Sequence, residues 1–293
     1  MRKVILTIIV AAMIAVVGIS LTACNNATPQ GQLANILPDH NHEVFVYDAL
    51  NTMDNSTGVY TVNLDAFKNG TEVEFGTRKL ENVDAGIRVL GTLVFGDTKY
   101  EMGCYYKFVS GTSFMTPAYT FRTVTENGNK TFDMQGAYAG GNFTSERFVD
   151  DGSNSDTLKT SGTVFDNNQF QQVLRSVTTF SGLTLSFTTP IVTNDDAGVA
   201  SLTASGSSTA KLKDIPYTDA MEQYAEEGVP CYVINVSRAT DVAGMSHTLY
   251  YATDNIKSNG WAMKNILVKI IEPFTENNER FEMQYTLRSA SLS

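Results

Sequence analysis

Residues 100–108 read Tyr100-Glu101-Met102-Gly103-Cys104-Tyr105-Tyr106-Lys107-Phe108, and every second side chain, beginning with Tyr100, is apolar or aromatic. Successive side chains of a β-strand point to opposite faces, so this set shares one face of the strand. The other face carries Glu101 and Lys107. Such alternation is typical of a strand in an antiparallel sheet that is covered on one side. The run therefore predicts one strand of an all-β protein.

The same alternation recurs in residues 60–67, 132–138, 183–187 and 281–288. Between such runs lie short turn sequences, for example Phe95-Gly96-Asp97, which favour hairpins between neighbouring strands. By this pattern we expect about twelve strands. So many strands with one dry face are expected to curl, so the sequence predicts an antiparallel meander closed into a barrel or half-barrel.

Two segments change to helical spacing. An apolar stripe runs from Phe170 to Val177 behind a capping-box pair, Asp166 and Gln169. A second segment begins near proline and ends at glycine, over residues 216–228. We expect one or two short helices to pack on the apolar face of the sheet. Residues 195–208, rich in serine and alanine, predict a long loop or a weak edge hairpin.

The N-terminus has the layout of a secretory signal peptide, with two basic residues before the apolar run of residues 4–19. The run ends at Leu21-Thr22-Ala23-Cys24, which resembles the lipobox of bacterial lipoproteins. The resemblance implies a signal peptide over 1–23, a diacylglyceryl group on Cys24, and a polar tether over 24–42. It also implies that a single β-rich domain, 43–293, is anchored to a cell membrane or outer membrane outside the cytoplasm. The alternative is an ordinary signal peptide with an incidental Cys24.

The mature chain resembles the Lol-type half-barrel lipoprotein carriers, because a lipobox precedes a predicted meander with one aromatic face. The segment Thr163-Val164-Phe165-Asp166-Asn167-Asn168-Gln169, running into Leu174-Arg175, resembles uncharacterised envelope β-barrel domains. These resemblances imply the handling of an apolar ligand, and no functional residue is carried over from either family.

Composition and motifs favour a protein that is not an enzyme. The formal net charge of −10 argues against nucleic acid and against a basic surface for anionic lipid. A Gly-x-Ser-x-Gly nucleophile motif is absent from the sequence. Adjacent acidic pairs such as Asp150-Asp151 and Glu226-Glu227 point apart on an extended strand, so they do not form the converging carboxylates of a glycosidase. We expect no catalytic residue and no cofactor.

One concentrated set of metal-ligand residue types occurs, at Asp39-His40-Asn41-His42-Glu43. Two histidines with one residue between them share one side of an extended segment, so they can share a metal ion. The alternative is a solvated linker beside the tether, which we favour, and we therefore expect no metal site. The third histidine, His247, is predicted to begin a strand and has no evident partner in the sequence.

Cys104 and Cys231 remain once Cys24 is acylated, and each lies on the apolar face of a predicted strand. They allow a disulfide between distant strands, as proteins outside the cytoplasm often have. The alternative, which we favour, is two buried free thiols that act as small hydrophobic side chains.

The aromatic and methionine face leaves two functions open. It either lines a pocket for a hydrophobic or amphipathic ligand, lipid included, or forms an ordinary core. The first reading predicts an anchored binding or carrier module. The second predicts a structural or adhesive surface lipoprotein whose loops bind a partner that the sequence does not identify. The residues of this face are Tyr60, Tyr100, Met102, Tyr106, Phe108, Phe132, Met134, Tyr138, Phe281, Met283 and Tyr285.

Overall fold

One antiparallel sheet of fourteen strands dominates the computed structural model of the protein. Neighbouring strands pair in the order β10-β9-β8-β7-β6-β5-β2-β1-β18-β17-β14-β13-β12-β11. The structure describes residues 42–75, 78–108, 115–149, 152–167, 170–177, 179–193, 196–216, 224, 226–238, 246–253, 256–258, 261–263 and 265–292.

The pairing of β1 with β18 joins the two ends of the domain, and strands on both sides of this pair follow in meander order. On one side the strands are β1 (His42–Asn51), β2 (Ser56–Phe67), β5 (Gly86–Phe95), β6 (Thr98–Phe108), β7 (Met115–Glu126), β8 (Asn129–Ala139), β9 (Asn142–Val149) and β10 (Gly152–Lys159). On the other they are β11 (Thr184–Val192), β12 (Ala197–Leu212), β13 (Val229–Arg238), β14 (His247–Ala252), β17 (Leu267–Glu276) and β18 (Glu279–Leu292).

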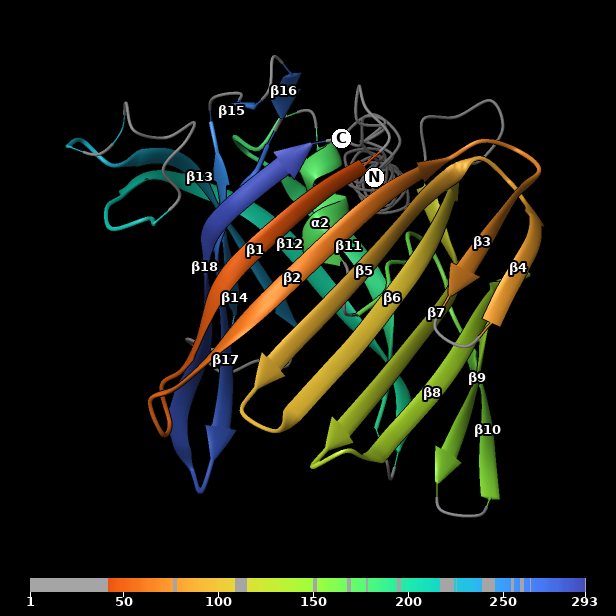
Figure 1. Ribbon diagram of the computed structural model, residues 1–293. Helices are drawn as coiled ribbons and strands as arrows, with labels where there is room; N and C mark the ends of the chain where they lie inside the picture. Colours follow the sequence, from red (N-terminus) through yellow and green to blue (C-terminus); the bar gives the residue numbers. More distant parts are fainter. Residues whose placement is uncertain are drawn as a thin grey trace, which may run out of the picture.

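The sheet curls until its two end strands, β10 and β11, approach each other (Figure 1). Side chains and a short connecting segment close this seam in place of a strand pair. Val164 forms an isolated bridge to Thr188 of β11. Arg122 donates to the carbonyl of Val192, and Arg147 donates to the carbonyl of Thr193 at 2.8 Å. The protein is a nearly closed antiparallel barrel, so the predicted fold class is confirmed.

A short helix lies inside the barrel, behind β1 and β2 in Figure 1. It consists of α2 (Phe170–Val173) and the 3-10 turn η2 (Leu174–Ser176), and each of these seven residues is buried. We call residues 170–176 the interior helix. The ring of Phe170 packs against Phe187 of β11, with 5.6 Å between centroids. The expected stripe is therefore present, in a helix shorter than its apolar spacing suggested.

Two other helix predictions fall partly outside the described residues. Gln169, one member of the predicted capping box, is not among the described residues. Residues 217–223 of the second predicted helix are not described either. The predicted stop at Gly228 is present: its backbone has φ of 87°, and its N–H donates to the carbonyl of Tyr224 at 2.8 Å.

A hairpin formed by β3 (Thr71–Phe75) and β4 (Arg78–Val83) covers part of the outer surface. Phe75 packs against the rings of Tyr105, Tyr119 and Phe121 at 5.7–6.3 Å. Parts of β6 and β7 are thus buried on both faces. A second small hairpin pairs β15 (Ile256–Ser258) with β16 (Trp261–Met263).

Three expectations need correction. The described residues form eighteen strands, fourteen of them in the main sheet, whereas about twelve were expected. The loop or weak hairpin predicted over 195–208 is wrong, because β12 is a sixteen-residue strand paired with β11 and β13. Its small residues suit a strand that packs closely between neighbours. The linker interpretation is also wrong at His42 and Glu43, which begin β1, since Glu43 is buried against a basic residue from the interior helix.

Candidate ligand-binding cavity

Tyrosine hydroxyls from the barrel wall hold the interior helix and the segment before it. Tyr251 donates to the carbonyl of Gln171 at 2.6 Å, and the hydroxyl of Tyr106 accepts the N–H of Asp166 at 3.1 Å. Burial raises the pKa of each of these two tyrosines well above the ordinary value for tyrosine, so both hydroxyls stay neutral. The interior helix is thereby held to β14, and the segment before it to β6.

One end of the interior helix is tightly filled. Arg175 donates to Glu43 at 2.7 Å in an ion pair whose side chains are 2% and 5% exposed. Arg175 Nε also donates to the carbonyl of Asn265, and Asn265 donates back to the carbonyl of Arg175 at 2.7 Å. The guanidinium lies 4.7 Å from the ring centroid of Phe45. At this end, near the start of β1, the buried polar groups form several hydrogen bonds and an ion pair.

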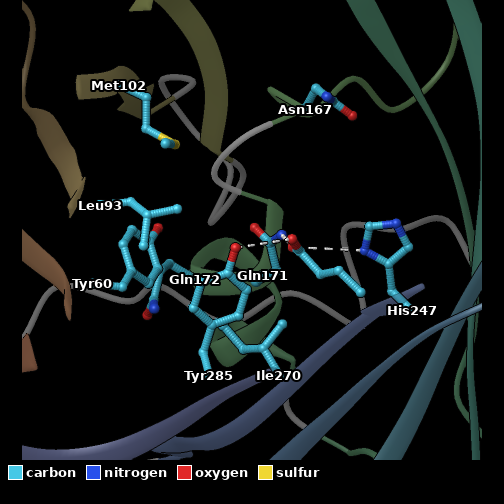
Figure 2. Close-up of a pocket in the computed structure, with 10 residues that line it drawn as sticks. Tyr60, Leu93, Met102, Asn167, Gln171, Gln172, His247, Ile270 and Tyr285 are labelled. Atoms are coloured by element: carbon cyan, nitrogen blue, oxygen red, sulfur yellow. Dashed lines mark hydrogen bonds and ion pairs between the residues drawn. The ribbon is translucent and has the colours of Figure 1, made fainter. Parts of the chain in front are cut away.

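The other end of the interior helix faces a cavity of about 170 Å³. On the barrel wall it is lined by β2, β5 and β6 near the β1–β2 and β5–β6 turns, by the paired strands β17 and β18, and by the first residue of β14. Figure 2 shows the side chains around this space. The lining residues are Tyr60, Leu93, Met102, Asn167, Gln171, Gln172, His247, Ile270, Glu272 and Tyr285.

The cavity has an apolar wall and a polar wall. The apolar wall contains Leu93, Met102 and Ile270 together with two tyrosine rings. The polar wall centres on Glu272, which accepts a hydrogen bond from Gln171 Nε2 at 2.9 Å and a longer one from the Tyr285 hydroxyl at 3.4 Å. The arrangement suits a small ligand with one polar and one apolar end.

His247 completes the polar wall. Its Nδ1 lies 3.8 Å from Glu272 Oε1, which is an ion-pair distance but too long for a hydrogen bond. This nitrogen is buried and has no hydrogen-bond partner. The two residues neighbour each other because the adjacent positions Thr248 and Ile271 pair across β14 and β17.

Gln172 lines the cavity, but its unpaired acceptor is buried away from it. The residue is 2% exposed, and its Oε1 is buried without a hydrogen-bond partner. Its side chain hydrogen-bonds to the hydroxyl of Tyr47, whose own proton goes to the carbonyl of Leu267 at 3.0 Å. The amide group that meets Tyr47 must therefore be the NH₂, because that hydroxyl oxygen can only accept. The orientation of the amide is thus fixed, and Oε1 is the orphan.

The tyrosines of the cavity remain protonated. Burial raises the pKa of both Tyr60 and Tyr285 well above its ordinary value, and the negative charge of Glu272 raises both further. The two rings lie 5.2 Å apart between centroids, at 55°. They form a rigid aromatic side of the cavity that adds no charge to it.

Three of the eleven residues predicted to line a pocket do so: Tyr60, Met102 and Tyr285. Most of the others pack in the core, as the alternative interpretation predicted. Tyr106 is buried in the main core, and Tyr100 and Met283 pack against that core. Phe132 and Met134 form a separate cluster at the seam, with Tyr138 packed against it. Phe281 contacts Phe274 at 5.8 Å, and the side chain of Phe108 lies outside what the structure describes.

Cys104 and Cys231 are both free and buried, so the disulfide interpretation is wrong for this structure. Burial raises the pKa of Cys231 to about 12 and that of Cys104 well above its ordinary value. Neither thiol has the lowered pKa of a reactive cysteine.

Several predictions about anchoring and metal binding concern residues that lie outside the described part of the chain. They include Cys24 with its signal peptide, most of the tether, and His40 of the histidine pair. The other member, His42, contacts Asp65. Among described residues, the His, Cys, Asp and Glu side chains form no cluster of three that could hold a metal ion. The same residues contain no helix long and apolar enough to span a bilayer.

Sequence reasoning missed the polar half of the cavity, namely Asn167, Gln171, Gln172, His247 and Glu272. The local sequence contained no signal for Gln171 and Gln172. Both lie off the apolar stripe that begins at Phe170, where an amphipathic helix is expected to be polar, and the structure shows that both are nevertheless buried.

Comparison with known proteins supports the fold. No protein-family model and no curated protein matches the sequence. A solved structure is similar, a β-barrel-like protein of the domain of unknown function DUF1849 from Brucella abortus, with a TM-score of 0.52. The identity is 9%, and the alignment covers 87% of this chain and 99% of the other. This likeness shows a shared β-barrel-like architecture.

Proposed function

We propose that this protein is a membrane-anchored, extracytoplasmic and non-enzymatic binding module for a small amphipathic ligand. The cavity at the end of the interior helix is the observation that carries the proposal, because apolar side chains and the carboxylate of Glu272 line the same volume. A bound ligand could donate to Glu272, while Leu93, Met102 and Ile270 contact the rest of the molecule.

The size of the cavity limits the ligand. An engineered cavity of about 150 Å³ holds benzene, and pockets for drug-sized molecules begin near about 300 Å³. A cavity of about 170 Å³ therefore suits a molecule of about six to ten heavy atoms. The interior helix occupies the space that a lipid chain would need. We accordingly narrow the expected ligand from lipid to a small amphipathic molecule.

Binding is tested by native mass spectrometry of the protein purified from host membranes, followed by thermal shifts with small aromatic and aliphatic alcohols. Leu93→Phe fills the cavity, whereas Val94→Phe places the same side chain on the outer face of the same strand, where Val94 is 39% exposed. We expect wild type and Val94→Phe to bind, and Leu93→Phe to lose binding. Equal binding by all three proteins would contradict the assignment of this cavity.

The anchor is tested separately. The lipobox motif supports acylation of Cys24, so Cys24→Ser should move the protein from the membrane fraction to the soluble fraction and remove the acyl mass from its N-terminal peptide. Cys231→Ser is the matched control, because it changes one thiol in the folded domain and leaves the motif intact. A membrane-bound Cys24→Ser protein would contradict lipid anchoring.

A structural or adhesive surface lipoprotein is the second candidate. It is favoured by the filled interior, since most of the predicted pocket residues pack as core. Failure of any small molecule to bind the wild-type protein, together with retained membrane anchoring, would support this candidate.

A further inference from the structure

We propose that the ligand carries a compact cation, of the primary ammonium class, on a short apolar body. This inference rests on the proposed binding function and specifies the chemistry of the same cavity. It is drawn from the charge of the lining, the hydrogen bonds at Glu272, and the aromatic side of the cavity.

The charge of the lining is the first argument. Glu272 is the one acidic residue among the ten that line the cavity, and this set contains no lysine or arginine. The imidazole of His247 is the nearest group that can become positive, and it makes no hydrogen bond to the carboxylate. An anionic ligand would thus meet Glu272 without a strong counter-charge, whereas a cation would be attracted to it.

The hydrogen bonds at Glu272 are the second argument. Its Oε1 accepts a hydrogen bond of 2.9 Å from Gln171, whereas its Oε2 receives one of 3.4 Å from Tyr285, which is long for this type. Oε2 is therefore the less satisfied oxygen of the carboxylate. An ammonium group has three donors and no acceptor, so it can donate to this oxygen.

The aromatic side is the third argument. The rings of Tyr60 and Tyr285 are close neighbours, and both tyrosines are buried. The face of an aromatic ring attracts a cation, more strongly when both are removed from water. Leu93 and Ile270 add an aliphatic surface for the apolar body of the ligand. The same small volume thus provides acceptors, a negative charge and aromatic rings.

Three probes of nearly equal size separate charge from shape: benzylammonium, benzyl alcohol and benzoate. Isothermal titration calorimetry of the full-length protein in detergent measures the affinity for each. We expect benzylammonium to bind about tenfold more tightly than benzyl alcohol, as befits a charge-assisted hydrogen bond. We expect benzoate to show no binding.

One substitution tests whether Glu272 recognises the charge of the ligand. Glu272→Gln should reduce benzylammonium affinity about tenfold and change benzyl alcohol affinity less than about twofold, because it removes the charge and keeps the shape. Glu276→Gln is the matched control: Glu276 is exposed on the same strand as Glu272 and does not line the cavity, so its loss should leave both affinities unchanged.

Failure of this inference is distinguishable from failure of the proposed function. Benzyl alcohol binding that Leu93→Phe abolishes, with equal or weaker binding of benzylammonium, overturns the cation assignment and leaves the binding function in place. Absence of binding for all three probes overturns the cation assignment and also counts against the binding function. Equal loss of benzylammonium affinity in Glu272→Gln and Glu276→Gln would overturn the role of Glu272.

Discussion

The two ends of the interior helix differ in how their buried polar groups are satisfied. At the Arg175 end, an ion pair with Glu43 and reciprocal hydrogen bonds with Asn265 leave the guanidinium surrounded by acceptors. At the cavity end, the amide oxygen of Gln172 and the ring nitrogen of His247 have no hydrogen-bond partner. Both ends belong to one seven-residue segment in one barrel, so the difference is local.

This difference separates buried polar groups that have partners from buried polar groups that have none. Buried polar groups in folded proteins almost always have partners, and each exception calls for an explanation. The Arg175 end obeys this rule and contributes order to the structure. The cavity end departs from it. Each prediction below compares the two ends.

The largest expected effect is at the ion pair. Arg175→Met leaves Glu43 as a buried charge without its main partner, which should lower the free energy of unfolding by about 3–5 kcal/mol. Urea denaturation measures the loss. The double variant Arg175→Met with Glu43→Leu should recover most of it, since no buried charge then remains. The matched control is Arg280→Met, which breaks a half-exposed pair with Glu282 and should cost less than about 1 kcal/mol.

Truncation of a leucine should cost more at the filled end than at the cavity end. Leu174 is completely buried beside Arg175, so Leu174→Ala opens a new void and should cost about 3–5 kcal/mol. Leu93 already borders a cavity, so Leu93→Ala should fall near the lower limit of about 2 kcal/mol. Denaturation midpoints of both variants measure the difference. Equal losses would mean that the cavity end packs as tightly as the other.

Removal of one hydroxyl should likewise have unequal effects. Tyr251→Phe deletes the 2.6 Å hydrogen bond to the buried carbonyl of Gln171 and should cost about 1–3 kcal/mol. Tyr285→Phe deletes a 3.4 Å hydrogen bond to Glu272, which is partly exposed to water, and should cost less than about 0.5 kcal/mol. Thermal unfolding of the two variants compares them directly. A larger loss for Tyr285→Phe would show that Glu272 depends on this hydroxyl.

The barrel was predictable because its strands are amphipathic over most of their length. On β18, for example, Tyr285 and Leu287 face the interior, as their alternation with polar residues indicates. The same rule is less informative on β6. Tyr105 and Tyr106 are adjacent and both buried, because the β3–β4 hairpin covers the outer face at Tyr105. Alternation identifies a dry face, but it does not reveal what a hairpin elsewhere in the chain will cover.

The polar wall of the cavity was not predictable, because its members are brought together by strand register. His247 and Glu272 are twenty-five positions apart in sequence and meet through the pairing of β14 with β17, whose register shifts between Tyr250 and Tyr251. Such an irregularity moves side chains relative to any regular extrapolation. The buried partnership of Glu43 with Arg175 has the same origin, since 132 positions separate the two residues.

The smallest expected effect has the opposite sign to the others. Gln172→Met gives up the hydrogen bond to Tyr47, which contributes about 0.5–1.5 kcal/mol, and removes an orphan acceptor whose burial costs about 1–3 kcal/mol. The free protein should therefore be unchanged or more stable by up to about 1 kcal/mol, as guanidinium denaturation can measure. A loss of more than about 1 kcal/mol would show instead that the hydrogen bond to Tyr47 makes Gln172 part of the fold, as Arg175 is.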